Sequence, residues 1–231
     1  MLLATGAELA VSASPPLLPV MPLISRSLTE VVEASLAGGA RCVQLREKEA
    51  STREFIELGR ALRPLCDLHQ ALLIINDRAD VALACQADGL HVGQSDIAIA
   101  DARALLGSEA ILGLSVESIE QALSPEAAAA DYLGVSPIFA TPTKTDAAEP
   151  WGLAGLRQLK ERLAAEPQFA AKPLVAIGGL NASNASEVIA AGADSLAVVS
   201  ALCSSQQPSE AARRLLAQIS AARASAPRHS A

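Results

Sequence analysis

The sequence contains few aromatic residues and has a deficit of positive charge. Of its 231 residues, 2% are aromatic, and 18 Lys and Arg stand against 25 Asp and Glu, which gives a formal net charge of -7. Proteins that bind nucleic acid through basic surfaces or stacking platforms have the opposite balance. The composition therefore argues against a nucleic-acid partner, and any phosphate contact must be local.

The cysteines and the apolar segments exclude further classes of protein. Cys42, Cys66, Cys85 and Cys203 form no Cys-x-x-Cys pair, which argues against a zinc ribbon and a disulfide scaffold. The uncharged stretch 9–25 is broken by several prolines and lacks a basic segment before it, unlike a membrane span or a signal peptide. We therefore expect a cytoplasmic protein with no membrane partner.

Apolar, strand-like runs alternate with segments of helical periodicity along the whole chain. This alternation is typical of repeated βα units around a parallel sheet. No Gly-x-Gly-x-x-Gly motif follows the first run, which disfavours an open dinucleotide-binding sheet. The eight runs are 18–24, 42–45, 71–75, 89–92, 111–114, 132–135, 174–177 and 195–199.

This count predicts an α/β protein with a single-domain (β/α)8 TIM barrel. We place the barrel at residues 17–223, between a flexible N-terminal segment, 1–16, and a flexible C-terminal tail, 224–231. The active face of such a barrel lies at the carboxyl ends of its strands. Polar residues directly after each run are therefore the candidates for chemistry.

Two cations and an amide follow the second run. Gln44, Arg46 and Lys48 alternate in the sequence, so they share one orientation while the strand persists. An arginine fork, a lysine charge and an amide suit an anionic phosphate attached to a polar heterocycle. The alternative is a solvated strand end whose cations pair with Glu47 and Glu49.

Two carboxylates follow the third and fourth runs. Asp77 follows Asn76 at the end of one run, and Asp96 ends the segment after the next. Two carboxylates on adjacent strands are a common arrangement for Mg²⁺, which completes its shell with water and substrate phosphates. The alternative is that each aspartate caps the helix that follows it.

The fourth and fifth runs also contain a histidine and a serine. We interpret His91, inside a strand, as a core residue with satisfied hydrogen bonds and not as a general base. Ser115 either binds a substrate or caps the next helix.

The last three units contain hydroxyl groups and glycines. A long polar loop after the sixth run contains Thr141, Pro142, Thr143 and Lys144, which suit a phosphate or diphosphate. Gly178 and Gly179 follow the seventh run, and Val199 and Ser200 end the eighth. Barrels often bind phosphate at these last two loops, where glycine lets backbone N–H groups approach the oxygens.

Five motifs, taken together and in order, resemble the thiamine phosphate synthase family. They are Gln-Leu-Arg-Glu-Lys at 44–48, Ile-Asn-Asp-Arg at 75–78, His-Val-Gly-Gln-x-Asp at 91–96, Thr-Pro-Thr-Lys-x-Asp at 141–146 and Ile-Gly-Gly-Leu at 177–180. The resemblance extends over about residues 38–202. It implies an Mg²⁺-dependent transferase that joins a pyrimidine diphosphate, 4-amino-2-methyl-5-hydroxymethylpyrimidine diphosphate, to a thiazole phosphate. Thiamine phosphate and pyrophosphate would be the products.

The resemblance also implies a role for each motif residue. Asp77 and Asp96 would bind Mg²⁺, and Arg46, Lys48, Ser115 and Lys144 would act on the reacting diphosphate. The pyrimidine diphosphate would be held by Gln44, Arg46, Lys48, Asn76, Ser115 and Lys144. The thiazole phosphate would be held by Thr141, Pro142, Thr143, Gly179, Val199 and Ser200.

Three alternatives to the synthase remain open from the sequence. One is the thiazole tautomerase that shares this barrel, although the diphosphate-binding residues favour the synthase. Another is a Schiff-base lyase with Lys48 or Lys144 as nucleophile. The third is a non-catalytic barrel that binds phosphate without turnover. The segment 18–25 departs from the family, which usually has a tyrosine at the end of its first strand. The sequence does not define an oligomeric state and is compatible with a homo-oligomer.

Overall fold

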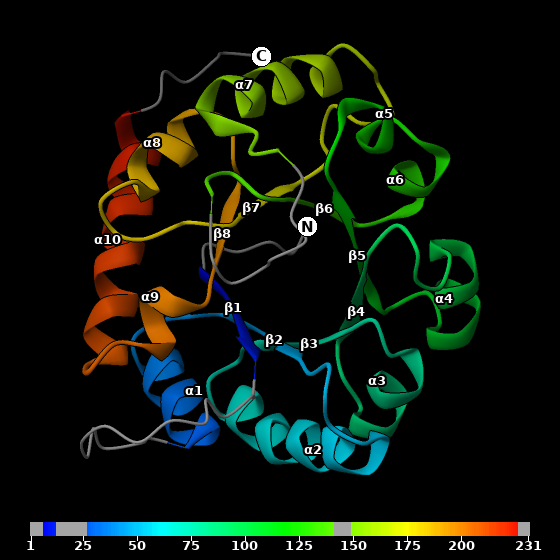
Figure 1. Ribbon diagram of the computed structural model, residues 1–231, viewed down its shortest axis with the longest axis vertical. Helices are drawn as coiled ribbons and strands as arrows, with labels where there is room; N and C mark the ends of the chain where they lie inside the picture. Colours follow the sequence, from blue (N-terminus) through cyan, green and yellow to red (C-terminus); the bar gives the residue numbers. More distant parts are fainter. Residues whose placement is uncertain (1–6, 13–26, 141–148, 226–231) are drawn as a thin grey trace.

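The computed structural model describes residues 7–12, 27–140 and 149–225, and within them parallel strands alternate with helices (Figure 1). The strands are β1 (Ala7–Ser12), β2 (Cys42–Arg46), β3 (Leu72–Asn76), β4 (Gly89–Val92), β5 (Ile111–Val116), β6 (Tyr132–Val135), β7 (Leu174–Ile177) and β8 (Ser195–Val198). The helices are α1 (Leu28–Ala37), α2 (Thr52–Leu68), α3 (Ala79–Cys85), α4 (Ile99–Leu106), α5 (Ile119–Ala122), α6 (Pro125–Ala129), α7 (Gly152–Ala164), α8 (Ala185–Ala190), α9 (Ser200–Cys203) and α10 (Pro208–Ser225).

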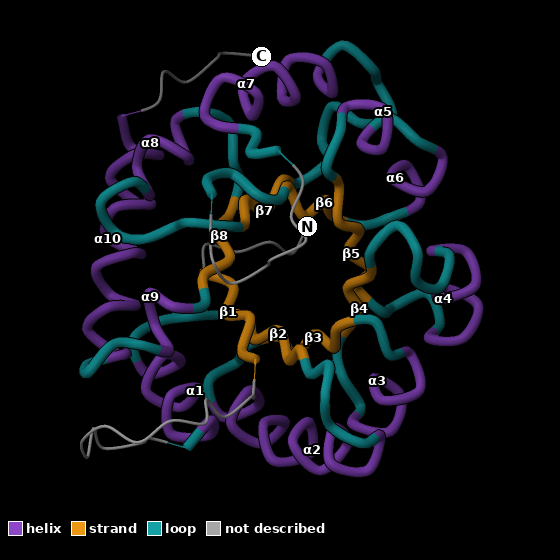
Figure 2. Tube along the Cα trace, in the orientation of Figure 1, coloured by secondary structure: helices purple, strands orange, loops and turns teal. Residues whose placement is uncertain are grey.

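The strands lie side by side in chain order, and the helices surround them (Figure 2). Every neighbouring pair is parallel, and β1 pairs with both β2 and β8, so the strands form a closed ring. The prediction of an α/β protein with a parallel sheet is confirmed. Seven of the eight predicted runs, from the second to the last, coincide with β2–β8 to within one or two residues.

The first strand differs from the prediction. The sequence places it at 18–24, a segment that lies outside the described residues. In the structure the position between β8 and β2 is occupied by β1, which lies within the segment 1–16 that we expected to be flexible. Both segments contain consecutive apolar residues, and such a short run does not by itself specify its partner strands.

Side chains on the two faces of the sheet build separate hydrophobic clusters. Residues that point outward, such as Leu73, Leu90 and Leu112, belong to a large core between the sheet and the helices. Inside the ring, Tyr132, Val175 and Ala197 form a second, smaller cluster. The alternation of strand side chains creates this division, and it directs the polar residues at alternate positions into the ring.

An Ala-Asp dipeptide precedes three alternate strands and ties each to its neighbour. Asp88, Asp131 and Asp194 each accept a hydrogen bond, at 2.7 to 2.9 Å, from the first or second amide of the preceding strand. Each also pairs with a cation, which is Arg63, Arg103 or Lys160, respectively. The repeated dipeptide thus satisfies a strand amide and joins a helix to the sheet end opposite the candidate site.

Two of the helices start at capping boxes. Ser27 with Glu30, and Ser51 with Glu54, satisfy each other's backbone N–H groups at the starts of α1 and α2. Within the described residues, no helix combines the length and the apolar character needed to cross a membrane.

Candidate active site

The second strand directs its polar residues to the rim of the ring as predicted. Gln44 is buried in β2, Arg46 is partly buried at its end, and Lys48 is exposed just beyond it. The charges of Arg46 and Lys48 both act on Asp77. Two cations and a carboxylate from adjacent strand ends therefore lie in one region. Arg46 and Lys48 interact with Asp77 and are not simply solvated side chains at the end of a strand.

Asp77 and Asp96 do not cap the helices that follow them. The residues at the N-caps of α3 and α4 are Arg78 and Ala98, and neither side chain makes a capping bond. The Asp77 backbone has φ 63°, a conformation that a non-glycine residue adopts only where its surroundings hold it. Its N–H donates to the His91 carbonyl of β4 at 2.8 Å, which helps to fix the position of this residue.

A tight turn orients the second carboxylate. The Asp96 Oδ2 atom accepts the Gly93 N–H at 2.7 Å. A Cβ atom on Gly93 would lie 3.1 Å from the same oxygen, so glycine leaves the carboxylate room to turn back on the loop. The Gly-Gln-x-Asp motif therefore orients the Asp96 carboxylate, and it does not cap a helix.

The two carboxyl groups lie close enough for Asp96 to raise the pKa of Asp77. Burial raises the pKa of Asp77 to about 6, and both the charge of Asp96 and a side-chain hydrogen bond with it add to the rise. Arg46 and Lys48 oppose this rise in the pKa but do not cancel it. A pair of neighbouring carboxyl groups beside two basic side chains suits a divalent cation. In the described part of the chain, no group of three or more His, Cys, Asp or Glu side chains is placed to hold a metal ion.

Ser115 lies at the end of β5 and is held by β4. Its hydroxyl is 2.8 Å from the His91 Nε2 atom, and its carbonyl accepts the Gln94 Nε2–H at 2.6 Å. The next helix, α5, is capped by Ser118 instead. The interpretation of Ser115 as a helix cap is therefore wrong. Its side chain lies near the end of β5 and is only partly buried.

The loops after β7 and β8 contribute a second part of the site. Gly178 and Gly179 have φ 100° and 68°, which other residues rarely adopt. A Cβ atom on Gly179 would lie 2.7 Å from the Cβ atom of Phe139, so this glycine permits close packing of the loops after β6 and β7. Val199 is partly buried and Ser200 is exposed at the start of α9.

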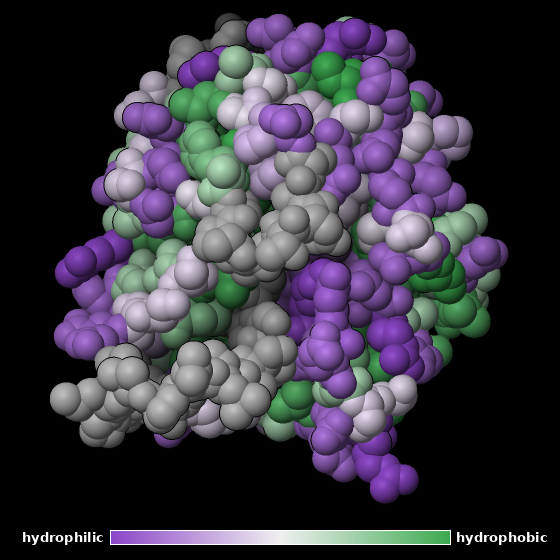
Figure 3. Space-filling model, in the orientation of Figure 1, coloured by the Kyte–Doolittle hydropathy of each residue, from purple (hydrophilic) through white to green (hydrophobic). Residues whose placement is uncertain are grey.

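The structure thus brings most of the predicted residues to one end of the ring. Asn76 ends β3 and is buried. Thr141, Pro142, Thr143 and Lys144 lie outside the described residues. The space-filling view has a hydrophilic surface beside the centre of the molecule, where Figure 1 places β3 and β4 (Figure 3).

The sequence analysis missed two residues that support the site. Tyr132 begins β6 and is 2.9 Å, through its hydroxyl, from the His91 Nδ1 atom. Gln94 holds the end of β5. Strand side chains alternate between the two faces of a sheet, so Tyr132 and Gly134 point to the same side, into the ring. This alternation was the sequence signal that could have identified Tyr132. The signal for Gln94 was its place within the motif 91–96.

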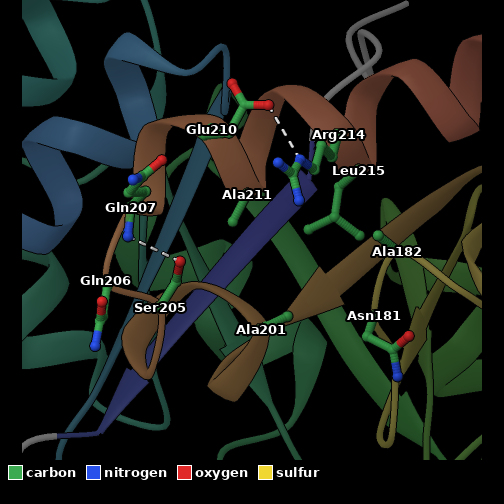
Figure 4. Close-up of a pocket in the computed structure, with 10 residues that line it drawn as sticks. All are labelled: Asn181, Ala182, Ala201, Ser205, Gln206, Gln207, Glu210, Ala211, Arg214 and Leu215. Atoms are coloured by element: carbon green, nitrogen blue, oxygen red, sulfur yellow. Dashed lines mark hydrogen bonds and ion pairs between the residues drawn. The ribbon is translucent and has the colours of Figure 1, made fainter.

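A separate pocket of about 380 Å³ lies beside α9 and the start of α10. Its lining includes Asn181, Ser205 and Gln207, together with Glu210 and Arg214, which pair at 3.0 Å (Figure 4). None of the predicted site residues lines it, and its charged groups neutralise each other. The strand ends around Asp77, and not this pocket, have the charges that suit a diphosphate.

Comparisons with known proteins identify the family of the chain. Residues 17–202 match the family described as thiamine monophosphate synthase. A thiamine-phosphate synthase of Albidiferax ferrireducens is 54% identical over 82% of this chain and 84% of its own, and one of Chloroflexus aurantiacus is 50% identical over 84% and 87%. The structure of a thiamine phosphate pyrophosphorylase from Pyrococcus furiosus superposes with a TM-score of 0.78 at 35% identity, covering 94% of this chain and 97% of its own. The chain belongs to the thiamine monophosphate synthase family.

Proposed function

We propose that the carboxyl ends of β2–β8 are where this chain carries out the thiamine-phosphate synthase reaction of its relatives. In that reaction the bond between the methylene carbon of the pyrimidine and its diphosphate breaks. A bond from that carbon to the nitrogen of a thiazole phosphate forms, and pyrophosphate leaves. The observation that supports this location best is the meeting of Asp77 and Asp96 with Arg46 and Lys48.

The cations and polar groups around the carboxylates would bind the pyrimidine diphosphate. Arg46 offers a bidentate fork and Lys48 a mobile point charge, and both stabilise the negative charge that develops on the leaving diphosphate. Gln44 and Asn76 would orient the pyrimidine ring from β2 and β3. Ser115 would donate a hydrogen bond, and Lys144 would add a further charge by analogy with the family motif.

The residues at the site fit magnesium. Asp77 and Asp96 would hold the ion, since their carboxylates lie together and the charges of Arg46 and Lys48 only partly offset the effect of Asp96 on Asp77. When bound, Mg²⁺ would neutralise part of the diphosphate charge and so make it a better leaving group. Neither aspartate needs to accept a proton in this mechanism.

The loops after β6, β7 and β8 would bind the second substrate. Gly179, Val199 and Ser200 would hold the thiazole phosphate through backbone N–H groups and one hydroxyl. Thr141, Pro142 and Thr143 would complete this part of the site. Holding both substrates in line lets the thiazole nitrogen attack without a protein nucleophile, because positioning replaces a bimolecular encounter.

A direct assay tests the proposal. The purified chain is incubated with the pyrimidine diphosphate, the thiazole phosphate and Mg²⁺, and the product is oxidised to a fluorescent thiochrome. We expect thiochrome fluorescence and pyrophosphate release in equal amounts, and neither when one substrate is omitted. Isomerisation of a thiazole phosphate without condensation would contradict the synthase and favour the tautomerase.

We also infer that the sheet closes as a complete (β/α)8 barrel. The closed pairing of β1 with β2 and β8 supports this inference, and the family match that begins at residue 17 makes 18–24 a second candidate for the same position. Deletion of residues 1–26 should sharply lower the melting temperature, because it exposes the edges of β2 and β8. Deletion of residues 1–13 removes β1 and keeps 18–24, so its melting temperature shows which of the two segments fills the position. If the deletion of 1–26 leaves the melting temperature unchanged, the sheet is not closed.

Three further predictions from the sequence also remain proposals. They are the cytoplasmic location, a homo-oligomeric state, and a set of partners limited to phosphorylated small molecules. Gel filtration of the purified chain, with and without both substrates, tests the second of them.

A further inference from the structure

A chain of three side chains crosses the inside of the ring from β6 to the rim of β5. The Tyr132 hydroxyl is 2.9 Å from His91 Nδ1, and His91 Nε2 is 2.8 Å from Ser115 Oγ. His91 and Tyr132 are buried, with 3% and 2% of their surface exposed, whereas Ser115 is only partly buried. Both ring nitrogens of the buried histidine are therefore engaged, and the chain ends at the one partly buried side chain of the three.

Two glycines make room for this chain. Gly113 pairs in register with His91 on one side and with Tyr132 on the other. A Cβ atom on Gly113 would lie 2.1 Å from Tyr132 Cζ and 2.5 Å from His91 Nδ1. A Cβ atom on Gly134 would lie 2.8 Å from His91 Cε1. The absence of side chains at both positions lets the histidine and tyrosine rings meet with their centroids 5.4 Å apart.

The surroundings of His91 favour a neutral ring. The ring is buried, and its two nitrogens face the uncharged hydroxyl groups of Tyr132 and Ser115, so a charged imidazolium would be costly there. A neutral imidazole has one N–H and one bare nitrogen. With one hydroxyl group at each nitrogen, only two arrangements of the protons satisfy both hydrogen bonds.

The acidities of the two hydroxyl groups favour one of these arrangements. A phenol, with a pKa of about 10, is a better hydrogen-bond donor than the aliphatic hydroxyl of serine. Tyr132 therefore donates to Nδ1, and the Nε2–H donates to Ser115 Oγ. In this arrangement the Ser115 proton is not used within the chain and is free to point toward the rim. The reverse arrangement would use that proton in a bond to His91.

We propose that His91 is a positioning residue that donates its Nε2–H to Ser115 and thereby directs the Ser115 hydroxyl proton to the pyrimidine diphosphate. The diphosphate oxygens and ring nitrogens of this substrate accept hydrogen bonds. A Ser115 hydroxyl that donates its proton therefore complements them. The inference depends on the proposed role of Ser115 in the synthase reaction.

Nitrogen NMR of the ring tests the arrangement directly. The chain has three histidines, so labelling histidine with ¹⁵N gives three sets of ring signals, and a His91→Gln spectrum identifies the set of this residue. We expect its Nε2 signal in the range of a protonated nitrogen and its Nδ1 signal in the range of a bare one. The opposite assignment, or a doubly protonated ring at neutral pH, would overturn the proposal.

A double-mutant cycle tests the action through Ser115. Tyr132→Phe keeps the ring and removes one oxygen, so it is expected to fold where a histidine variant fails. It should lower kcat roughly tenfold, the value of one ordinary hydrogen bond, with little change in KM. In a Ser115→Ala background, the same change should have no further effect on kcat.

The outcomes separate the inference from the function on which it rests. If Ser115→Ala lowers kcat and Tyr132→Phe lowers it further by an independent factor, the positioning role is wrong while the role of Ser115 stands. If Ser115→Ala leaves kcat unchanged, both the role of Ser115 and the inference fail. Product formation by the wild type is judged separately with the thiochrome assay.

Discussion

Asp77 follows β3 and Asp96 follows β4, yet the two carboxyl groups share a hydrogen bond, and Asp96 raises the affinity of Asp77 for a proton. Eighteen residues lie between them in the sequence. The parallel register brings the two strand ends together, because Asn76 pairs with His91. The fold thus brings together two carboxylates that each resemble an ordinary helix cap in the sequence.

Removing one carboxylate should abolish activity without unfolding the protein. Asp77→Asn keeps the shape of the side chain but loses the charge that would hold Mg²⁺, so we expect kcat to fall by roughly a hundredfold or more. The melting temperature should change little, because a rim carboxylate contributes little to the core. Asp101→Asn, at an exposed position in the first turn of α4, is the control and should keep full activity.

The dependence on Mg²⁺ should change with pH. The pKa of Asp77 is raised to about 6, so below that pH a proton competes with the cation for the carboxylate. The Mg²⁺ concentration for half-maximal activity should fall by up to about tenfold per unit as the pH rises to 6, and then level off. Titration with Mg²⁺ at several pH values checks this, and a midpoint independent of pH would contradict it.

The same pKa shift predicts how the stability of the metal-free protein depends on pH. A carboxyl group whose pKa is higher in the folded state than the ordinary value of 3.8 binds its proton more tightly when folded. Its contribution is fully present below pH 3.8 and is lost as the pH rises through about 6. The free energy of unfolding in chelator should therefore fall over that range less steeply in Asp77→Asn than in the wild type.

The Ala-Asp dipeptides should matter for stability and not for catalysis. Arg63 contacts both Asp88 and Asp67 at 2.7 Å, but only Asp88 also accepts a strand amide, that of Leu73. Asp88→Ala leaves that amide without its acceptor and should cost about 1–3 kcal/mol. Asp67→Ala breaks only an exposed i,i+4 pair and should cost at most about 0.5 kcal/mol. Urea unfolding of both variants gives the comparison, and equal losses would contradict the role of the amide.

Lys144 distinguishes the transferase from a Schiff-base enzyme. It lies outside the described residues, and its role is predicted from its motif. A charge acting on the leaving diphosphate contributes a few kcal/mol, so Lys144→Ala should lower kcat by roughly a hundredfold. Lys144→Arg should recover part of that activity because the charge remains. Two equally inactive variants, together with borohydride trapping of a covalent adduct on the wild type, would contradict the transferase.

The sequence by itself determined the elements and most of the chemistry. The positions of β2–β8 follow from apolar runs whose length and spacing leave little choice. Gln44, Arg46 and Lys48 share a face because strand side chains alternate, a local rule that needs no tertiary information. Asp77 and Asp96 lie directly after strands, so a parallel sheet has to bring them to the same end.

Tertiary structure decided what depends on contacts between strands. The sequence allowed Asp77, Asp96 and Ser115 to be helix caps. In the structure, other residues occupy the N-cap positions of α3, α4 and α5. Tyr132 was overlooked because its partner His91 lies 41 residues away and the glycine between them in the sheet, Gly113, belongs to a third strand. The first strand shows the same limit: several short apolar segments can fill an edge, and the register with β2 and β8, not local composition, selects among them.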